Sequence, residues 1–294
     1  SANTQVAYGQ TAGQLARLGV PAMHDSGYIG TGILVAVLDA GFNYYKKHEA
    51  TRLISVPPGH IRDFVEGDYS IQDTVTFGAD FSHGQYVLSC VGGNRIGRYV
   101  GPAYGASFAL ARTEDTMTET TSELVNWAMG AEWADSLGAK IITSSLGYNL
   151  MDDPSETLTY PMLNGHTTLI TRAAEIAASR GILVVNSAGN DGNNPAAGYK
   201  IAAPADIAPT SGVAFSINHI AGQPDDVGGL PTKSYTTMNL VAAYKLPTQT
   251  QITVGILNLE NKKPELIGYD GRPWNFYLYD ALGRQLFVRL QQTF

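Results

Sequence analysis

The sequence lacks the features that mark disulfide-stabilised, nucleic-acid-binding and membrane-spanning proteins. It has a single cysteine, Cys90, among 294 residues, so no disulfide bond can form within the chain. Only 15% of its residues are charged, and the net charge of −7 comes without any run of lysines and arginines, which argues against a nucleic-acid partner. The longest apolar runs are about six residues, far short of a membrane span. A hydrophobic content of 44% is nevertheless enough to bury a large core.

One apolar run gives the first clue to the fold. The unbroken stretch from Ile33 to Leu38 predicts a buried strand of a parallel sheet, and Asp39 stands at its carboxyl end. In open α/β sheets, ligands and catalytic groups gather outside the carboxyl ends of the strands. Asp39 is therefore a candidate functional carboxylate, with capping of the turn before Gly41 as the structural alternative.

A histidine is the second candidate. Small and apolar residues from Val87 onward predict a buried helix, with His83 in its first turn and Gly84 leaving room for a close contact. A lone histidine is more often structural than catalytic. This one, however, opens a buried helix in a chain that already offers an acid at a strand end.

The middle of the chain predicts helix-then-strand units, which are typical of a parallel sheet with crossover helices. A capping-box sequence at Thr120 and Glu123 opens one of these helices. The expected strands span 106–112, 139–144 and 182–186, the expected helices span 120–138 and 168–180, a helical segment spans 11–24, and loops span 43–80.

The composition changes at Pro204. Residues 204–235 are rich in Pro, Gly, Asp and Ser and are expected to form loops. The strand-like runs beyond them, at 238–244, 251–257, 275–279 and 285–290, predict a small C-terminal β-sandwich. We therefore expect two domains, 1–230 and 231–294.

The polar groups at the predicted strand ends fit acyl transfer by a serine. That chemistry needs a base, a buried carboxylate that orients the base, and donors for the oxyanion. Asp39 would orient His83, His83 would be the base, and the side-chain amide of Asn190 would donate to the oxyanion.

Four motifs, in this order, resemble the subtilisin-like serine proteases. They are Val35-Ala-Val-Leu-Asp39-Ala-Gly41, Ser82-His83-Gly84, Ser144-Ser145-Leu146-Gly147 and Ser187-Ala188-Gly189-Asn190. Three runs look more narrowly like the secreted subtilases of Bacteroidetes-type bacteria: Asp39-Ala-Gly-Phe, His83-Gly-x-Tyr-Val-Leu-Ser and Val184-Val-Asn-Ser-Ala-Gly-Asn190. The resemblance covers about residues 7–207 and implies an α/β fold, a three-layer parallel sheet with flanking helices.

The resemblance also implies a function and roles for particular residues. It implies a secreted or cell-surface endopeptidase, with Asp39 and His83 in the catalytic triad and Asn190 at the oxyanion hole. An extended peptide would bind along Ser145, Leu146 and Gly147 and near Ala188 and Gly189. The implied partners are a peptide or protein substrate and a prosegment or protein inhibitor. The chemistry needs no cofactor. Many subtilases carry a structural Ca²⁺, for which Asp152, Asp153 and Glu156, or Asp191, could supply oxygen ligands, with solvated loop residues as the more common alternative.

The nucleophile of this family is missing from the sequence. Its motif, Gly-Thr-Ser-x-Ala-x-Pro, does not occur after Asn190, and the nearest match at Thr210-Ser211-Gly212 lacks the preceding glycine and a following apolar helix. Ser211 is thus a weak candidate. Three explanations stay open: a segment of the natural protein is absent from this sequence, which we favour; the protein is a pseudoprotease that binds extended peptides; or another chain supplies the serine.

The tail carries a second resemblance. The run from Phe276 to Val288 is similar to the C-terminal β-sandwich sorting domains of type IX secretion in the same bacteria. An ordinary β-hairpin with a glycine turn is the alternative. If the resemblance holds, it implies export across the outer membrane.

Overall fold

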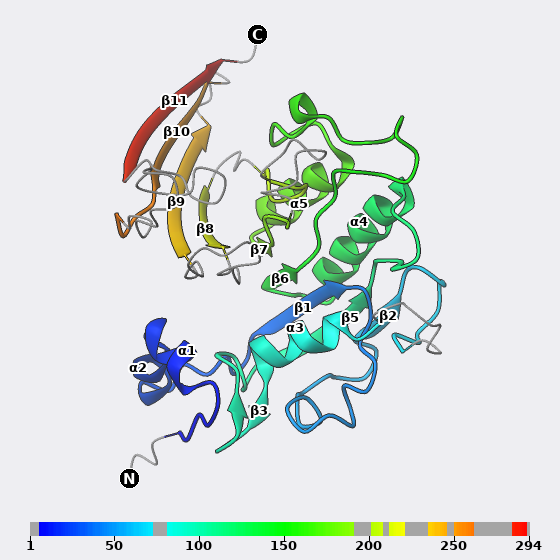
Figure 1. Ribbon diagram of the computed structural model, residues 1–294, viewed down its shortest axis with the longest axis vertical. Coiled ribbons are helices and arrows are strands. Elements are labelled where there is room, and N and C mark those ends of the chain that lie inside the picture. Colours follow the sequence, from blue (N-terminus) through cyan, green and yellow to red (C-terminus); the bar gives the residue numbers. More distant parts are fainter. Residues whose placement is uncertain are drawn as a thin grey trace, which may run out of the picture. The chain divides into compact units, whose positions relative to one another are not determined.

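The structure is a computed structural model that describes residues 6–72, 81–190, 201–207, 212–220, 235–245, 250–261 and 284–292. Figure 1 shows the helices and strands of the chain. The chain divides into two compact units. The first consists of Ser1–Leu158 and Ile176–Ser187, and the second of Thr159–Glu175 and Ala188–Phe294. None of the described helices is long and apolar enough to cross a membrane.

The first unit is built on a five-stranded sheet in the order β2-β5-β1-β6-β7, in which every pair of neighbours is parallel. Its strands are β1 (Leu34–Asp39), β2 (Ile61–Asp63), β5 (Ser107–Arg112), β6 (Ile141–Ser144) and β7 (Leu183–Asn186). The register aligns Asp39 with Arg112 and Ser144 with Asn186. The carboxyl ends of the central strands therefore meet at one edge of the sheet.

Helices cover both faces of this sheet. Val35 and Val37 of β1 lie in one core cluster with Leu88 of α3 (His83–Gly92). Side chains alternate along a strand, so Leu38 points to the opposite face, where it packs against Gly130 of α4 (Thr121–Ser136). These contacts confirm the predicted α/β class, a parallel sheet flanked by helices.

Two expectations for the N-terminal part were wrong in detail. The predicted helical segment 11–24 is two helices, α1 (Ala12–Arg17) and α2 (Val20–Asp25), because Gly19 between them has a left-handed φ of 71°. The expected loops of 43–80 contain β2, which pairs with β5 although it is too short to give a sequence pattern. A small hairpin of β3 (Asn94–Arg95) and β4 (Tyr99–Val100) completes this unit.

The second unit contains a four-stranded antiparallel sheet in the order β11-β10-β9-β8. Its strands are β8 (Gly212–Ile220), β9 (Tyr235–Lys245), β10 (Thr250–Leu257) and β11 (Gln285–Gln292), and the η1 turn (Tyr160–Met162) and helix α5 (Leu169–Ser179) precede them. Strand β8 lies where only loops were expected, so that expectation was wrong.

The C-terminal β-sandwich is not confirmed, because the described residues of the second unit form one sheet and no second sheet facing it. The predicted boundary near residue 230 falls between β8 and β9, which are paired. The division into 1–230 and 231–294 stays a prediction. Residues 276–283 of the type IX resemblance lie outside the described residues.

Candidate active site

Asp39 and His83 form the polar centre of the first unit. His83 Nδ1 lies 2.6 Å from Asp39 Oδ1, the carboxylate is fully buried, and the imidazole is 43% exposed. Asp39 Oδ1 also accepts the Ala40 N–H at 2.8 Å. Because a carboxylate only accepts hydrogen bonds, Nδ1 carries the proton and the lone pair of neutral His83 sits on Nε2. The structure thus brings together the two residues that the sequence paired, in the arrangement a general base requires.

Two glycines allow the start of α3 to approach the end of β1. A Cβ on Gly84 would stand 2.6 Å from the Gly41 carbonyl oxygen and 2.8 Å from Asp39 Cβ. Gly41 has a φ of 149°, and a Cβ there would stand 2.7 Å from the Phe81 carbonyl oxygen. All three distances are too short for a Cβ atom. The prediction that Gly84 leaves room for a close contact is confirmed.

A buried ion pair supports the segment before His83. Arg112 Nη1 lies 2.9 Å from Asp63 Oδ2, and both side chains are almost completely buried. The Arg112 guanidinium also lies over the Phe81 ring, 5.1 Å from its centroid. The sequence analysis missed this pair, because Asp63 ends a strand of three residues that no pattern predicts.

The segment after β6 is held from one side. The carbonyl oxygen of Leu146 accepts the Asn186 side-chain amide at 2.9 Å and the Ser187 hydroxyl at 2.8 Å. Leu146 is buried, whereas Gly147 is exposed. The candidate substrate edge Ser145–Gly147 is therefore fixed by residues that directly follow or end β7.

A second acid lies at the same edge. The Tyr148 hydroxyl donates to Glu114 Oε2 at 2.5 Å, and Tyr148 is fully buried. Burial raises the pKa of Glu114, an effect that the Tyr148 hydrogen bond partly offsets. Burial, followed by the charge of Glu114, also raises the pKa of Glu123 to about 8. The sequence analysis missed Glu114, although its place just after the predicted strand 106–112 could have revealed it.

Ala188, Gly189 and Asn190 belong to the second unit. The Ala202 N–H donates to the Ala188 carbonyl at 3.1 Å, and Gly189 has a φ of 90°. Asn190 is exposed. Its role beside Asp39 and His83 stays a prediction, and Ser211 and Asp191 lie outside the described residues.

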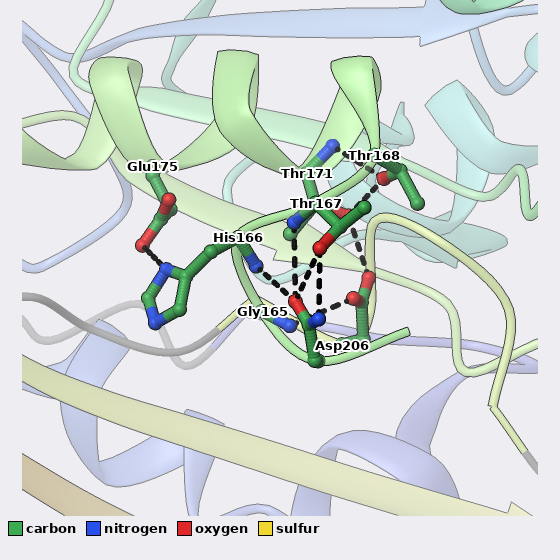
Figure 2. A network of polar contacts seen from close by, with 8 residues as sticks. Gly165, His166, Thr167, Thr168, Thr171, Glu175 and Asp206 are labelled. Carbon is green, nitrogen blue, oxygen red and sulfur yellow. Dashed lines mark hydrogen bonds and ion pairs between the residues drawn. The ribbon is translucent and has the colours of Figure 1, made fainter. Parts of the chain in front are cut away.

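The 201–207 loop, which includes Ala202, is anchored by Asp206 (Figure 2). Asp206 accepts the Thr171 hydroxyl at 2.6 Å and the Gly165 N–H at 3.0 Å. Figure 2 also shows His166 turned toward Glu175, with 2.7 Å between Nδ1 and Oε1. The loop that contacts Ala188 is therefore tied to the start of α5.

Two of the candidate calcium ligands, Asp152 and Asp153, accept hydrogen bonds from backbone N–H groups. Asp152 Oδ2 accepts the Glu119 N–H at 3.0 Å, and Asp153 Oδ1 accepts the Ser155 N–H at 2.8 Å. Hydrogen bonds from Ser155 lower the pKa of Asp153. In the described part of the chain, no three His, Cys, Asp or Glu side chains gather as a metal site. The calcium ion stays a prediction.

Two curated proteases resemble part of this chain in sequence. Subtilisin BL of Lederbergia lenta is 30% identical over 183 residues, which cover 60% of this chain and 55% of that protein. The minor extracellular protease Vpr of Bacillus subtilis (strain 168) is 31% identical over 183 residues, covering 61% of this chain and 20% of that protein. The chain thus spans about half the length, or less, of these curated relatives.

Solved structures give weaker matches. The prenylagaramide maturation protease PagA is 19% identical with a TM-score of 0.43, covering 71% of this chain and 59% of that one. MycP1 with its N-terminal propeptide removed is 23% identical with a TM-score of 0.41, and the match covers 60% of this chain and 48% of that one. The sequence profile of the subtilase family, peptidase S8, matches residues 30–255. Because this profile matches more than half of the chain, the chain belongs to the subtilase family.

Proposed function

We propose that this chain carries the peptidase domain of a serine endopeptidase, which hydrolyses peptide bonds through an acyl-enzyme. The observation that carries the proposal is the 2.6 Å contact between buried Asp39 and half-exposed His83 in a member of the subtilase family. A buried carboxylate that orients an accessible imidazole is the working part of a serine-hydrolase triad.

The reaction begins with proton transfer to His83. Its Nε2 takes the proton of a serine hydroxyl as the serine oxygen bonds to the substrate carbonyl carbon, while Asp39 stabilises the imidazolium. The imidazolium then gives the proton to the leaving amine as the peptide bond breaks. Water then hydrolyses the resulting ester in the same way: His83 accepts a proton from the water as the water oxygen bonds to the ester carbon, and returns the proton to the serine oxygen as the ester bond breaks. The serine itself is not identified, because the nucleophile motif of the family is missing from the sequence. Ser211, the weak candidate that the sequence offers, lies outside the described residues.

The side-chain amide of Asn190 would donate to the oxyanion that forms in this step. Loss of such a donor costs about 10²–10³-fold in rate. The contact between Ala188 and Ala202 supports this role, since it fixes the segment that precedes Asn190.

The substrate would bind as an added strand along Ser145–Gly147. The Leu146 carbonyl is turned inward to Asn186 and Ser187. Successive peptide groups alternate in extended chain, so the neighbouring peptide groups would face the other way, toward a substrate. Gly147 has no side chain to block the main chain of the peptide.

Family membership supports a proposal for partners and location. We propose a peptide or protein substrate, a prosegment or protein inhibitor as a further partner, and secretion, which the extracellular relative Vpr supports. A structural calcium ion takes part in no step. The type IX sorting tail remains a prediction from the sequence.

Labelling with a fluorophosphonate tests the proposal, because this reagent bonds covalently to an activated serine. The parent in this test is the natural protein, including any segment that this sequence lacks. The parent and its His60→Ala variant should be labelled, and its His83→Ala variant should not. His60 is a suitable control because its ring hydrogen-bonds to the Pro58 carbonyl of its own loop at 3.0 Å. A parent chain that binds peptides but takes no label would favour the pseudoprotease.

A further inference from the structure

Glu114 and Tyr148 are two titratable groups that the reaction above does not use. The Tyr148 hydroxyl is 2.5 Å from Glu114 Oε2, Tyr148 is fully buried and Glu114 is half-buried. A carboxyl group withdrawn from water lowers stability unless its charge is compensated. The pair therefore calls for a functional explanation.

The strand register places Glu114 beside the reacting groups. Arg112, the last residue of β5, is the register partner of Asp39, and the Thr113 N–H donates to the Asp39 carbonyl at 3.0 Å. Glu114 follows directly, and its carboxylate interacts electrostatically with Asp39 and with His83. A second negative charge thus lies near the imidazole.

Tyr148 connects this charge to the candidate substrate edge. It directly follows Gly147, in the segment whose Leu146 carbonyl is held by Asn186 and Ser187. The hydrogen bond from Tyr148 therefore fixes the Glu114 carboxylate to a segment that is itself anchored at the end of the sheet.

We propose that Glu114 is a positioning residue for His83, whose carboxylate favours the imidazolium that forms when His83 accepts a proton, with Tyr148 holding that carboxylate in place. The catalytic meaning of this inference rests on the proposed function. The effect of the charge on His83 is a property of the folded chain and can be measured without any reaction.

The direction of the effect follows from reciprocity. Burial raises the pKa of Glu114, and the hydrogen bond from Tyr148 and the charge of His83 lower it, whereas Asp39 and Asp115 raise it. If protonated His83 favours the Glu114 carboxylate, then the carboxylate favours protonated His83 to the same extent. Removing the charge must therefore shift the His83 titration to lower pH.

Other charged groups surround the pair and remain in place in the test. The titratable neighbours are Asp39, His83, Asp115, Glu119 and Glu123, and Arg112 lies beside them in its ion pair with Asp63.

The experiment is a titration of the full chain labelled with ¹³C-histidine, followed by NMR, with His83→Ala used to assign the His83 signal. In Glu114→Gln the midpoint of the His83 titration should fall by about half a pH unit. Glu114→Asp, which keeps the charge, should recover part of this shift. Tyr148→Phe should shift the midpoint the same way by less, because Glu114 then ionises at higher pH. Glu132→Gln, an exposed change on α4, should leave the midpoint unchanged.

A His83 midpoint that is equal or higher in Glu114→Gln would overturn the inference. If that variant does not fold, Tyr148→Phe decides by the same criterion. Where the parent hydrolyses peptides, the acidic limb of its kcat/KM profile should move with the midpoint while KM stays constant. A shifted midpoint in a chain without activity would support the charge effect on His83 and contradict the proposed function. An unshifted midpoint in an active chain would contradict the charge effect and support the proposed function.

Discussion

Gly84 and Asp39 touch where helix α3 begins, so that a methyl group on Gly84 would lie 2.8 Å from Asp39 Cβ. The same methyl group would lie 2.6 Å from the Gly41 carbonyl oxygen, and neither neighbour is a flexible side chain. We expect Gly84→Ala to lower the free energy of unfolding by about 1–3 kcal/mol and to displace His83. Urea denaturation followed by circular dichroism measures the loss.

Gly13→Ala is the matched control, since Gly13 lies in helix α1 with no atom within 4 Å of the added methyl group. Replacing a helical glycine with alanine there should be neutral or stabilise the chain by up to about 1 kcal/mol. Equal losses in the two variants would contradict the steric explanation.

Asp39→Asn tests the orientation of the base. An amide can hold the imidazole in the wrong tautomer and cannot stabilise the imidazolium, so we expect kcat to fall by about 10³–10⁴-fold with little change in KM. Cleavage of a chromogenic peptide measures both constants. A kcat that falls by less than about tenfold, far less than the expected loss, would show that His83 does not depend on this carboxylate.

The buried pair of Asp63 and Arg112 predicts a large loss when one partner is removed. Asp63→Ala leaves the Arg112 charge buried without its carboxylate, and we expect the free energy of unfolding to fall by about 3–5 kcal/mol. The comparison is Glu49→Gln, which breaks a solvent-exposed contact of 3.6 Å with Arg95. That change should cost less than about 1 kcal/mol. Thermal unfolding of the two variants measures both losses of stability. Similar losses would contradict the difference between a buried and an exposed ion pair.

Glu123 predicts a pH dependence of stability. Its two carboxylate oxygens accept the N–H groups of Asp115 and Thr120, and burial raises its pKa from 4.5 to about 8. The folded chain therefore binds this proton more tightly than the unfolded chain, and the resulting stability is complete below about pH 4.5 and disappears as the pH rises through about 8.

The Glu123→Gln variant lacks this proton. Between about pH 5 and about pH 9, the free energy of unfolding of the parent should fall by about 1–3 kcal/mol relative to the variant. Urea denaturation at both pH values measures this difference. If the free energies of unfolding of the parent and of Glu123→Gln changed with pH in the same way, this would contradict the raised pKa of Glu123.

The sequence predicted the functional residues that stand at the end or at the start of an element with a clear pattern. Asp39 ends a run of apolar residues, and His83 opens a helix of small and apolar residues, so topology alone places both at one edge. The sequence analysis missed Asp63 because it ends a strand too short to give a pattern. It missed Glu114 because this residue lies two positions beyond the predicted strand 106–112 and not at its end. The sequence analysis missed strand β8 because Pro and Gly residues around it outweighed the alternating apolar pattern of Val213, Phe215 and Ile217.

The order of strands in the first unit also bears on synthesis. Strand β1 pairs with segments that come much later in the chain, Leu34 with Ser107 and Val35 with Ile141. Loop closure must precede such pairing, so the sheet forms late. Until β6 leaves the ribosome, the apolar strand β1 lacks at least one neighbour, and it can pair with other nascent chains instead.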